Sequence, residues 1–122
     1  MGQALKISEA LVICSHADSR HIACTLIEES GFEVLEADTM EDGAAHLMQH
    51  AQSVSLVFAE ANDAEEARRL ALLIQDQWPW IKVLVAIDHT AVAIADMPHS
   101  AILMRRPWRP LDLLIEAERA TK

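Results

Sequence analysis

Five short apolar runs alternate along this chain with longer segments whose apolar residues recur at helical spacing. Strand-like runs separated by helical patterns of ten or more residues are typical of βα units stacked around a parallel sheet. The chain has 122 residues, 52% of them hydrophobic, so residues 1–122 are predicted to form a single domain with one compact core. The runs are residues 10–14 (ALVIC), 32–37 (FEVLEA), 54–59 (VSLVFA), 82–87 (KVLVAI) and 101–104 (AILM).

Capping residues indicate where the helices between these runs begin. The first helix is predicted to begin near Asp18 or Ser19, and later ones at Thr39 and Asn62, since short polar side chains cap helix N-termini. The last helix is predicted to begin near Pro110, because proline suits the first turn. Between the fourth and fifth runs the pattern is weakest and predicts a short or irregular fourth helix. The predicted inner faces are Ile22, Leu26 and Ile27 in the first helix and Leu111, Leu114 and Ile115 in the last.

The net charge of −9 argues against a nucleic-acid binder, because phosphate contacts need a basic face. The charge is uneven: residues 1–66 hold thirteen acids and two bases, whereas residues 67–122 hold six acids and eight bases. No apolar run approaches the roughly 18 residues that cross a bilayer, and the N-terminus lacks a targeting pattern, so the protein is predicted to be cytoplasmic, without membrane contact. Cys14 and Cys24 are interpreted as small buried residues.

The ends of the predicted strands hold the candidate functional residues, because ligands of open α/β sheets bind beyond the carboxyl ends of the strands. These residues include few groups that could act together as acid, base and nucleophile, so the chain is predicted not to be an enzyme. No Gly-rich loop follows the first run, so neither nucleotide binding nor another cofactor is expected. The residues at the strand ends are Cys14, Ser15, His16, Glu60, Ile87, Arg106 and Pro107.

Three stretches make the interpretation more specific: GFEVLEADTMEDG after the first helix, DQWPWIKVLV into the fourth strand and RRPWRPLDLL into the last helix. In this order and spacing the chain resembles the receiver domain of bacterial response regulators, in particular receivers of alphaproteobacterial type. The resemblance covers nearly the whole chain. It implies a flavodoxin-like, doubly wound (βα)5 fold, an α/β architecture with a five-stranded parallel sheet in the order 2-1-3-4-5. It also implies a part in two-component or phosphorelay signalling.

The resemblance implies a phosphorylation site, from which this chain departs. Receivers accept a phosphoryl group on an aspartate at the end of the third strand, beside Mg²⁺ held by carboxylates after the first strand. Here Glu60 stands at the acceptor position, while Ser15 and His16 stand at the metal-binding positions, which puts Mg²⁺ binding in doubt. The additional methylene of Glu60 moves its carboxylate by roughly 1.5 Å, which disfavours phosphoryl transfer.

The positions that would sense a phosphoryl group also differ. Ile87 stands where the resemblance implies a hydroxyl residue, and Leu103 stands at the aromatic switch position. Arg106 keeps a positive charge at the place of the family's lysine, and the resemblance implies a cis peptide between Arg106 and Pro107. Two arrangements stay open: an ion pair between Glu60 and Arg106, or a solvated Glu60 with Arg106 turned outward.

These departures favour a degenerate receiver, or pseudo-receiver, that acts through protein contacts without the usual phosphorylation. The expected partner is a histidine kinase, another signalling protein or a second copy of the chain. Trp108 and Arg109 are the partner-binding candidates, because they lie in a basic and aromatic corner, RRPWR, and tryptophan is frequent at binding hot spots.

Two alternatives remain at this point. The chain could be a working phosphoacceptor that uses Glu60, or an acid such as Asp18 or Asp63. It could instead be a small enzyme or ligand-binding domain on the same flavodoxin-like scaffold. His46 and His50 share a helix face but lack a motif that completes a metal site, so they are interpreted as surface residues and no metal site is predicted.

Overall fold

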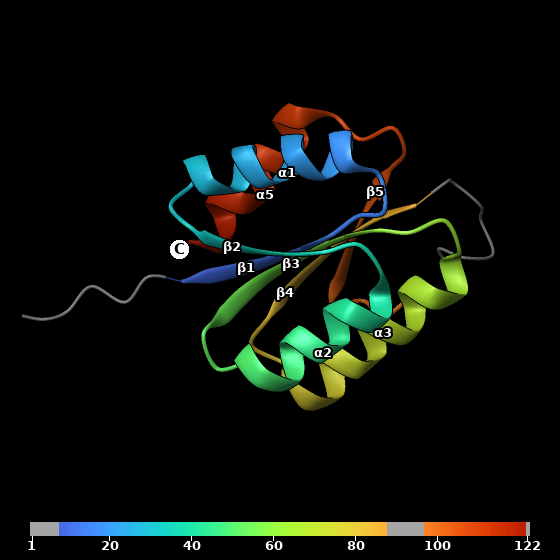
Figure 1. The fold of residues 1–122 in the computed structure, drawn as a ribbon. Coiled ribbons are helices and arrows are strands. Elements are labelled where there is room, and N and C mark those ends of the chain that lie inside the picture. Colours follow the sequence, from blue (N-terminus) through green and yellow to red (C-terminus); the bar gives the residue numbers. More distant parts are fainter. Residues whose placement is uncertain (1–7, 88–96, 122) are drawn as a thin grey trace, which may run out of the picture.

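The computed structural model describes residues 8–87 and 97–121, which form five strands and four helices (Figure 1). The fourth helix predicted between the last two strands lies outside these residues. No helix in the described ranges is long and apolar enough to cross a membrane. In chain order the elements are β1 (Glu9–Ile13), α1 (Ala17–Glu29), β2 (Glu33–Ala37), α2 (Met40–His50), β3 (Val54–Glu60), α3 (Ala64–Gln77), β4 (Lys82–Ile87), β5 (Ala101–Arg105) and α5 (Pro110–Ala120).

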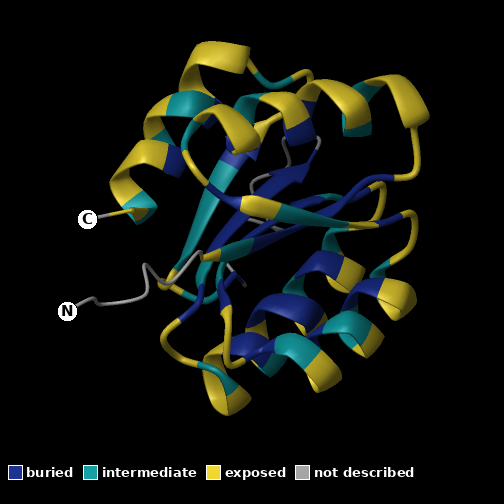
Figure 2. Ribbon diagram, turned by 60° about the vertical axis from the view of Figure 1, so that its left-hand side comes forward, coloured by how far each residue is buried: buried dark blue, intermediate teal, exposed yellow. Residues whose placement is uncertain are grey.

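The five strands form one parallel sheet in the order β2-β1-β3-β4-β5, which confirms the predicted flavodoxin-like fold. Helices α1 and α5 cover one face of the sheet, and α2 and α3 cover the other (Figure 1). The central strands are buried on both faces, whereas the edge strands β2 and β5 are partly accessible (Figure 2). Continuous apolar runs such as Val54–Glu60 form strands here because both of their faces are covered by helices.

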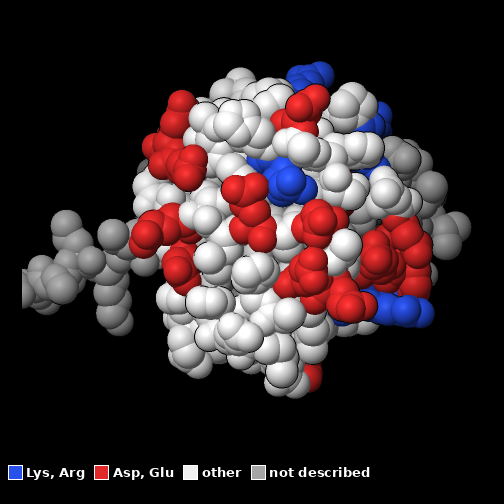
Figure 3. Space-filling view, viewed as in Figure 1, with Lys and Arg blue, Asp and Glu red and all other residues white. Residues whose placement is uncertain are grey.

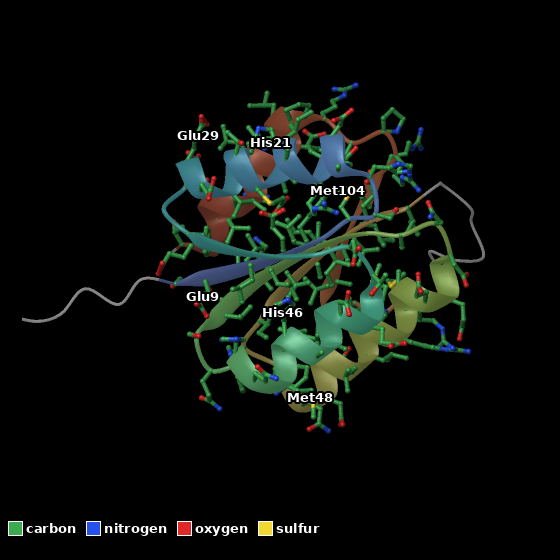
Figure 4. The ribbon with its side chains drawn as sticks, in the orientation of Figure 1. Glu9, His21, Glu29, His46, Met48 and Met104 are labelled. Atoms are coloured by element: carbon green, nitrogen blue, oxygen red, sulfur yellow. The ribbon has the colours of Figure 1, made fainter. Side chains whose placement is uncertain are left out.

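Side chains that alternate along the strands divide between two apolar clusters, one on each face. Leu11 and Ile13 point toward α2 and α3, whereas Val12 and Cys14 point toward α1 and α5. Figure 4 shows Met104 of β5 among the side chains beneath α1 and α5, and Met48 at the outer surface of α2.

The predicted helix starts are confirmed in part. Thr39 caps α2, since its Oγ1 accepts a hydrogen bond of 3.0 Å from the Asp42 N–H. Helix α1 begins at Ala17, one residue before Asp18, so the predicted start is close but the predicted cap is wrong: the N-cap residue is His16, which makes no side-chain capping bond. Helix α3 starts one residue later than predicted, where Asp63 accepts from the Glu65 N–H.

The predicted inner face of α1 is confirmed for Leu26 and Ile27, which pack against the core, but not for Ile22, which is 48% exposed. The predicted inner face of α5 is wrong, since Leu111 and Ile115 are exposed. The two helices lie beside each other on the sheet, and the fully buried Ala23 and Ala117 occupy positions facing it. Small residues permit this close approach. A stripe defined only by large apolar residues omits these alanines and includes exposed positions. The other buried residues of these two helices are Cys24 and Leu113.

Candidate functional site

The candidate site lies at the carboxyl ends of β1, β3 and β5, where the strand order reverses between β1 and β3. In the parallel register Ile13 is opposite Ala59, so the next residues along, Cys14 and Glu60, lie side by side. The segment after β5 brings Arg106 and Trp108 to the same place. We call Cys14, Glu60, Arg106 and Trp108 the Glu60 cluster.

The carboxylate of Glu60 is enclosed by three donor residues from two segments, the one after β1 and the one after β5. The thiol of Cys14 donates to Oε1 at 2.8 Å, and the indole Nε1–H of Trp108 donates to Oε2 at 3.0 Å. The Nε atom of Arg106 lies 3.4 Å from the same Oε2. The Glu60 side chain is 7% exposed, so both of its oxygens are committed to partners within the chain.

Arg106 is directed inward and forms an ion pair with Glu60, the first of the two arrangements left open by the sequence. Its side chain is 18% exposed. Its Nη1 donates to the carbonyl of Ala61 at 3.2 Å and to Oδ1 of Asn62 at 2.8 Å. The guanidinium therefore spans three consecutive residues at the end of β3, a geometry that suits its planar, forked set of donors.

Trp108 fixes the chain after β5 onto the central strand. Its ring packs edge-on against that of Phe58, with the ring centroids 5.2 Å apart and an interplanar angle of 76°. Phe58 is fully buried in β3. The indole of Trp108 thus has a partner for both its ring and its N–H within the chain, whereas Arg109 is exposed and lies outside the Glu60 cluster. Their predicted role in partner binding stays a prediction.

Cys14 is buried as predicted, but its role as a hydrogen-bond donor was not foreseen. Burial, together with the hydrogen bond to Glu60, raises the pKa of the Cys14 thiol to about 11, so the thiol stays protonated at neutral pH. The sequence contained a signal for this contact: Cys14 directly follows β1, and the end of β1 lies beside the end of β3, where Glu60 is. Arg20 supports this corner, since its Nη1 donates to the Cys14 carbonyl at 2.8 Å.

The residues at the positions where the resemblance implies metal ligands do not fit Mg²⁺. Ser15 and His16 are exposed, and neither supplies a carboxylate. The carboxylate of Glu60 already receives three donors. Mg²⁺ needs several hard oxygen ligands in near-octahedral array. Within residues 8–87 and 97–121, no group of three or more His, Cys, Asp or Glu side chains converges as a metal site.

Ile87 and Leu103, at the hydroxyl and switch positions, pack into the apolar cluster beneath α2 and α3. Neither side chain can form a hydrogen bond. The backbone carbonyl of Ile87 accepts from the N–H of Arg106 at 3.2 Å, which aligns the residue after β5 with the end of β4. The Arg106–Pro107 peptide is cis, as the resemblance implied.

The sheet order and the position of the crevice define a flavodoxin-like fold, and receiver domains are among the solved structures that superpose on this chain. The signal receiver domain of an HD domain-containing protein from Pseudomonas fluorescens Pf-5 matches with a TM-score of 0.79 and 18% identity, over 94% of each chain. An orphan response regulator of H. pylori matches with a TM-score of 0.77 and 19% identity, over 96% of this chain and 98% of that one.

A third structure, described as an atypical orphan response regulator with a phosphorylation-independent regulatory mechanism, has a TM-score of 0.75 and 19% identity, over 92% of this chain and 93% of that one. These identities establish the fold alone. No protein-family model matches the sequence, and no curated protein was found to be similar to it.

Proposed function

We propose that this chain is a pseudo-receiver: a cytoplasmic signalling module of a two-component or phosphorelay system that acts through protein contacts, without phosphorylation and without enzymatic activity. The observation that carries the proposal is the enclosure of the Glu60 carboxylate by Cys14, Arg106 and Trp108. The third solved structure supports it by analogy, because its description names a phosphorylation-independent mechanism.

An enclosed carboxylate is a poor phosphoryl acceptor. In-line transfer needs a carboxylate oxygen that is open to the incoming phosphorus and a cation that neutralises the developing charge. Here Oε1 and Oε2 of Glu60 already accept from the chain itself, and Ser15 and His16 supply no carboxylate for Mg²⁺. Attack by Glu60 would first have to break these contacts.

The Glu60 cluster also gives this domain one constant arrangement. A receiver that switches gains a negative charge at the acceptor only when it is phosphorylated. In this chain the Glu60 carboxylate is already paired with Arg106 and accepts from Trp108. We therefore expect Arg106 and Trp108 to keep the same position with or without a phosphate donor. The surface beside them would then have one conformation in which it binds a partner.

The test is incubation of the protein with acetyl phosphate and Mg²⁺, followed by intact mass measurement. We expect no species heavier by one phosphoryl group, while a receiver domain known to react with acetyl phosphate gains that mass in the same mixture. A Ser15→Asp/His16→Asp/Glu60→Asp variant, checked for folding by circular dichroism, is the matched comparison within this chain.

A phosphorylated wild-type protein would overturn the proposal. Peptide mapping would then locate the acceptor at Glu60, Asp18 or Asp63. The structure gives Asp63 a different role, since its side chain caps α3.

A further inference from the structure

A groove of about 670 Å³ lies between β5 and α5, next to the Glu60 cluster. Four consecutive residues of β5, 102–105, line it together with Trp108 and with Ile115 of α5. Its volume falls within the range of sites that hold small ligands or peptide side chains. Because four consecutive residues of a strand line it, the groove is suited to an extended occupant.

Among residues 8–87 and 97–121, no backbone group pairs with the outer side of β5. The Arg106 N–H donates to Ile87, so at this residue the backbone faces β4. Backbone groups of successive residues in a strand point to opposite sides, and those of Leu103 and Arg105 therefore point away from the sheet. In the described part of the chain, no backbone group pairs with them. An unpaired strand edge of this kind can accept a further strand.

The other edge of the sheet is different. Strand β2 carries two exposed acids, Glu33 and Glu36, within five residues, and acidic side chains outnumber basic ones on the face drawn in Figure 3. Charges along an edge strand discourage pairing with another strand. Strand β5 carries one charged residue, Arg105, at its end. The edge of β5 is thus the one better suited to pairing.

The charges at the groove favour an acidic occupant. Arg105 and Arg109 are exposed, and neither has a carboxylate oxygen within 4 Å among the described residues. The acid Glu116 is already paired with Lys82 at 3.1 Å and with Arg119 at 3.3 Å. Asp112 is the remaining acid in the lining and has no ion-pair partner among the described residues, so two arginines share the groove with one such carboxylate.

A second copy of the chain is a poorer occupant. Among the described residues of the groove, a second copy that paired through the same groove would offer Arg105 and Arg109 one unpaired acid, its own Asp112. An acidic segment offers each arginine a carboxylate. The overall charge of −9 does not prevent its binding, because charges farther away than about 8 Å are screened at physiological salt.

We propose that the outer edge of β5 and the adjoining face of α5 bind an extended, acidic segment of a partner protein, which adds to the sheet as a sixth strand. The segment pairs with the backbone of Leu103 and Arg105 and places carboxylates against Arg105 and Arg109, while its apolar side chains cover Trp108 and Ile115. This proposal rests on the proposed function, in which the domain acts through protein contacts.

The probe is a library of random linear peptides displayed on phage and selected against the complete chain. We expect the selected sequences to alternate apolar residues with Asp or Glu. Binding should protect the Leu103 and Arg105 amides from hydrogen exchange. Two synthetic copies of the best peptide are then N-methylated, one at the odd-numbered and one at the even-numbered residues. Methylation of the residues whose N–H groups face β5 should abolish binding, and methylation of the alternate residues should leave it intact.

Charge-reversal variants provide the matched comparison. An Arg105→Glu/Arg109→Glu double variant should weaken binding of the best peptide by about tenfold or more, because two charge contacts become repulsive. Arg69→Glu, a change of the same type on the exposed surface of α3, should leave the affinity unchanged. Circular dichroism confirms that both variants fold.

The proposal is overturned if the selection yields no binder, if the selected peptides lack acidic residues, or if amide protection appears away from β5. Sedimentation showing a dimer with protected Leu103 and Arg105 amides would identify a second copy as the occupant and also overturn it. The outcome is independent of the phosphorylation test: a phosphorylated Glu60 with unchanged peptide binding would refute only the proposed function, whereas an unphosphorylated protein without peptide binding would refute only this inference.

Discussion

The crevice around Glu60 and the groove between β5 and α5 share Trp108. Their polar groups differ in whether they have partners within the chain. In the crevice, a nearly buried carboxylate has donors on both oxygens. In the groove, the outward backbone of β5 and the guanidinium groups of Arg105 and Arg109 lack partners among the described residues. Buried polar groups need partners within the chain, whereas exposed ones remain available to another molecule. The comparison separates a structural centre from a surface suited to contact.

Trp108 connects these two regions. Its N–H donates to Glu60, and its ring contributes to the lining of the groove. A change at Glu60 that releases the indole should therefore alter the groove, while a change at the exposed end of the groove should leave the crevice intact. The following predictions test this asymmetry.

The largest effect is expected from Glu60→Ala. The variant leaves the Arg106 guanidinium without its carboxylate in a largely buried position and leaves the Trp108 N–H without its acceptor. We expect the free energy of unfolding to fall by about 3 kcal/mol, measured by urea denaturation. Glu118→Ala, which removes an exposed acid on α5, should cost less than about 0.5 kcal/mol. Equal stability of the two variants would contradict the account of the crevice.

Trp108→Phe tests the indole N–H separately from the ring. The variant keeps an aromatic ring beside Phe58 but loses the donor to a carboxylate, so we expect a loss of about 1.5–2 kcal/mol in the free energy of unfolding. Trp80→Phe is the matched control, because Trp80 donates to the neutral carbonyl of Ala51 at 3.0 Å. Its loss should be nearer 1 kcal/mol. A cost no larger for Trp108 than for Trp80 would show that the charged acceptor contributes nothing extra.

Arg106→Lys and Arg109→Lys compare two arginines three positions apart. A lysine at position 106 keeps the charge but cannot bridge Glu60, Ala61 and Asn62 together, so we expect a loss of about 1 kcal/mol in the free energy of unfolding. At position 109 the side chain is exposed, and the same exchange should have no measurable effect on stability. Equal shifts of the denaturation midpoint for Arg106→Lys and Arg109→Lys would contradict the difference between the crevice and the groove.

The smallest effect concerns the pH dependence contributed by Cys14. Its thiol pKa is raised from 9.0 to about 11, so above pH 9 the unfolded chain releases this proton while the folded chain keeps it. Stability therefore falls as pH rises. Between pH 8 and 10 the wild type should lose about 1 kcal/mol more than Cys14→Ala, as measured by urea denaturation at each pH. Parallel curves for the two proteins would refute a buried, protonated thiol at Glu60.

Much of the fold was predictable because five apolar runs with helical spacers leave few arrangements other than a parallel sheet. The position of the site followed from the strand ends. Large apolar residues predicted the inner face of α1 in part and that of α5 wrongly, since close packing buries Ala23 and Ala117 and leaves Ile22 and Leu111 exposed.

Within the site, the sequence placed Glu60 and Arg106 together but could not choose between an ion pair and an outward arginine. That choice depends on Cys14 and Trp108, whose donor groups meet the Glu60 carboxylate. The pairing of β1 with β3 places the thiol there, and the packing of Trp108 on Phe58 places the indole there. Sequence patterns encode which residues are apolar. They do not encode which atoms of an indole or a thiol meet a carboxylate from another strand.

The most direct test of the closed crevice follows the indole N–H signal of Trp108 by nuclear magnetic resonance while Mg²⁺ and beryllofluoride, a tetrahedral mimic of a phosphoryl group, are added to the isotope-labelled protein. The account predicts that the signal keeps its position and exchanges slowly with solvent, because Glu60 holds this N–H throughout. A saturable shift of the Trp108 signal that disappears in Glu60→Gln would show that the acceptor position opens to a phosphoryl group, and would contradict the account.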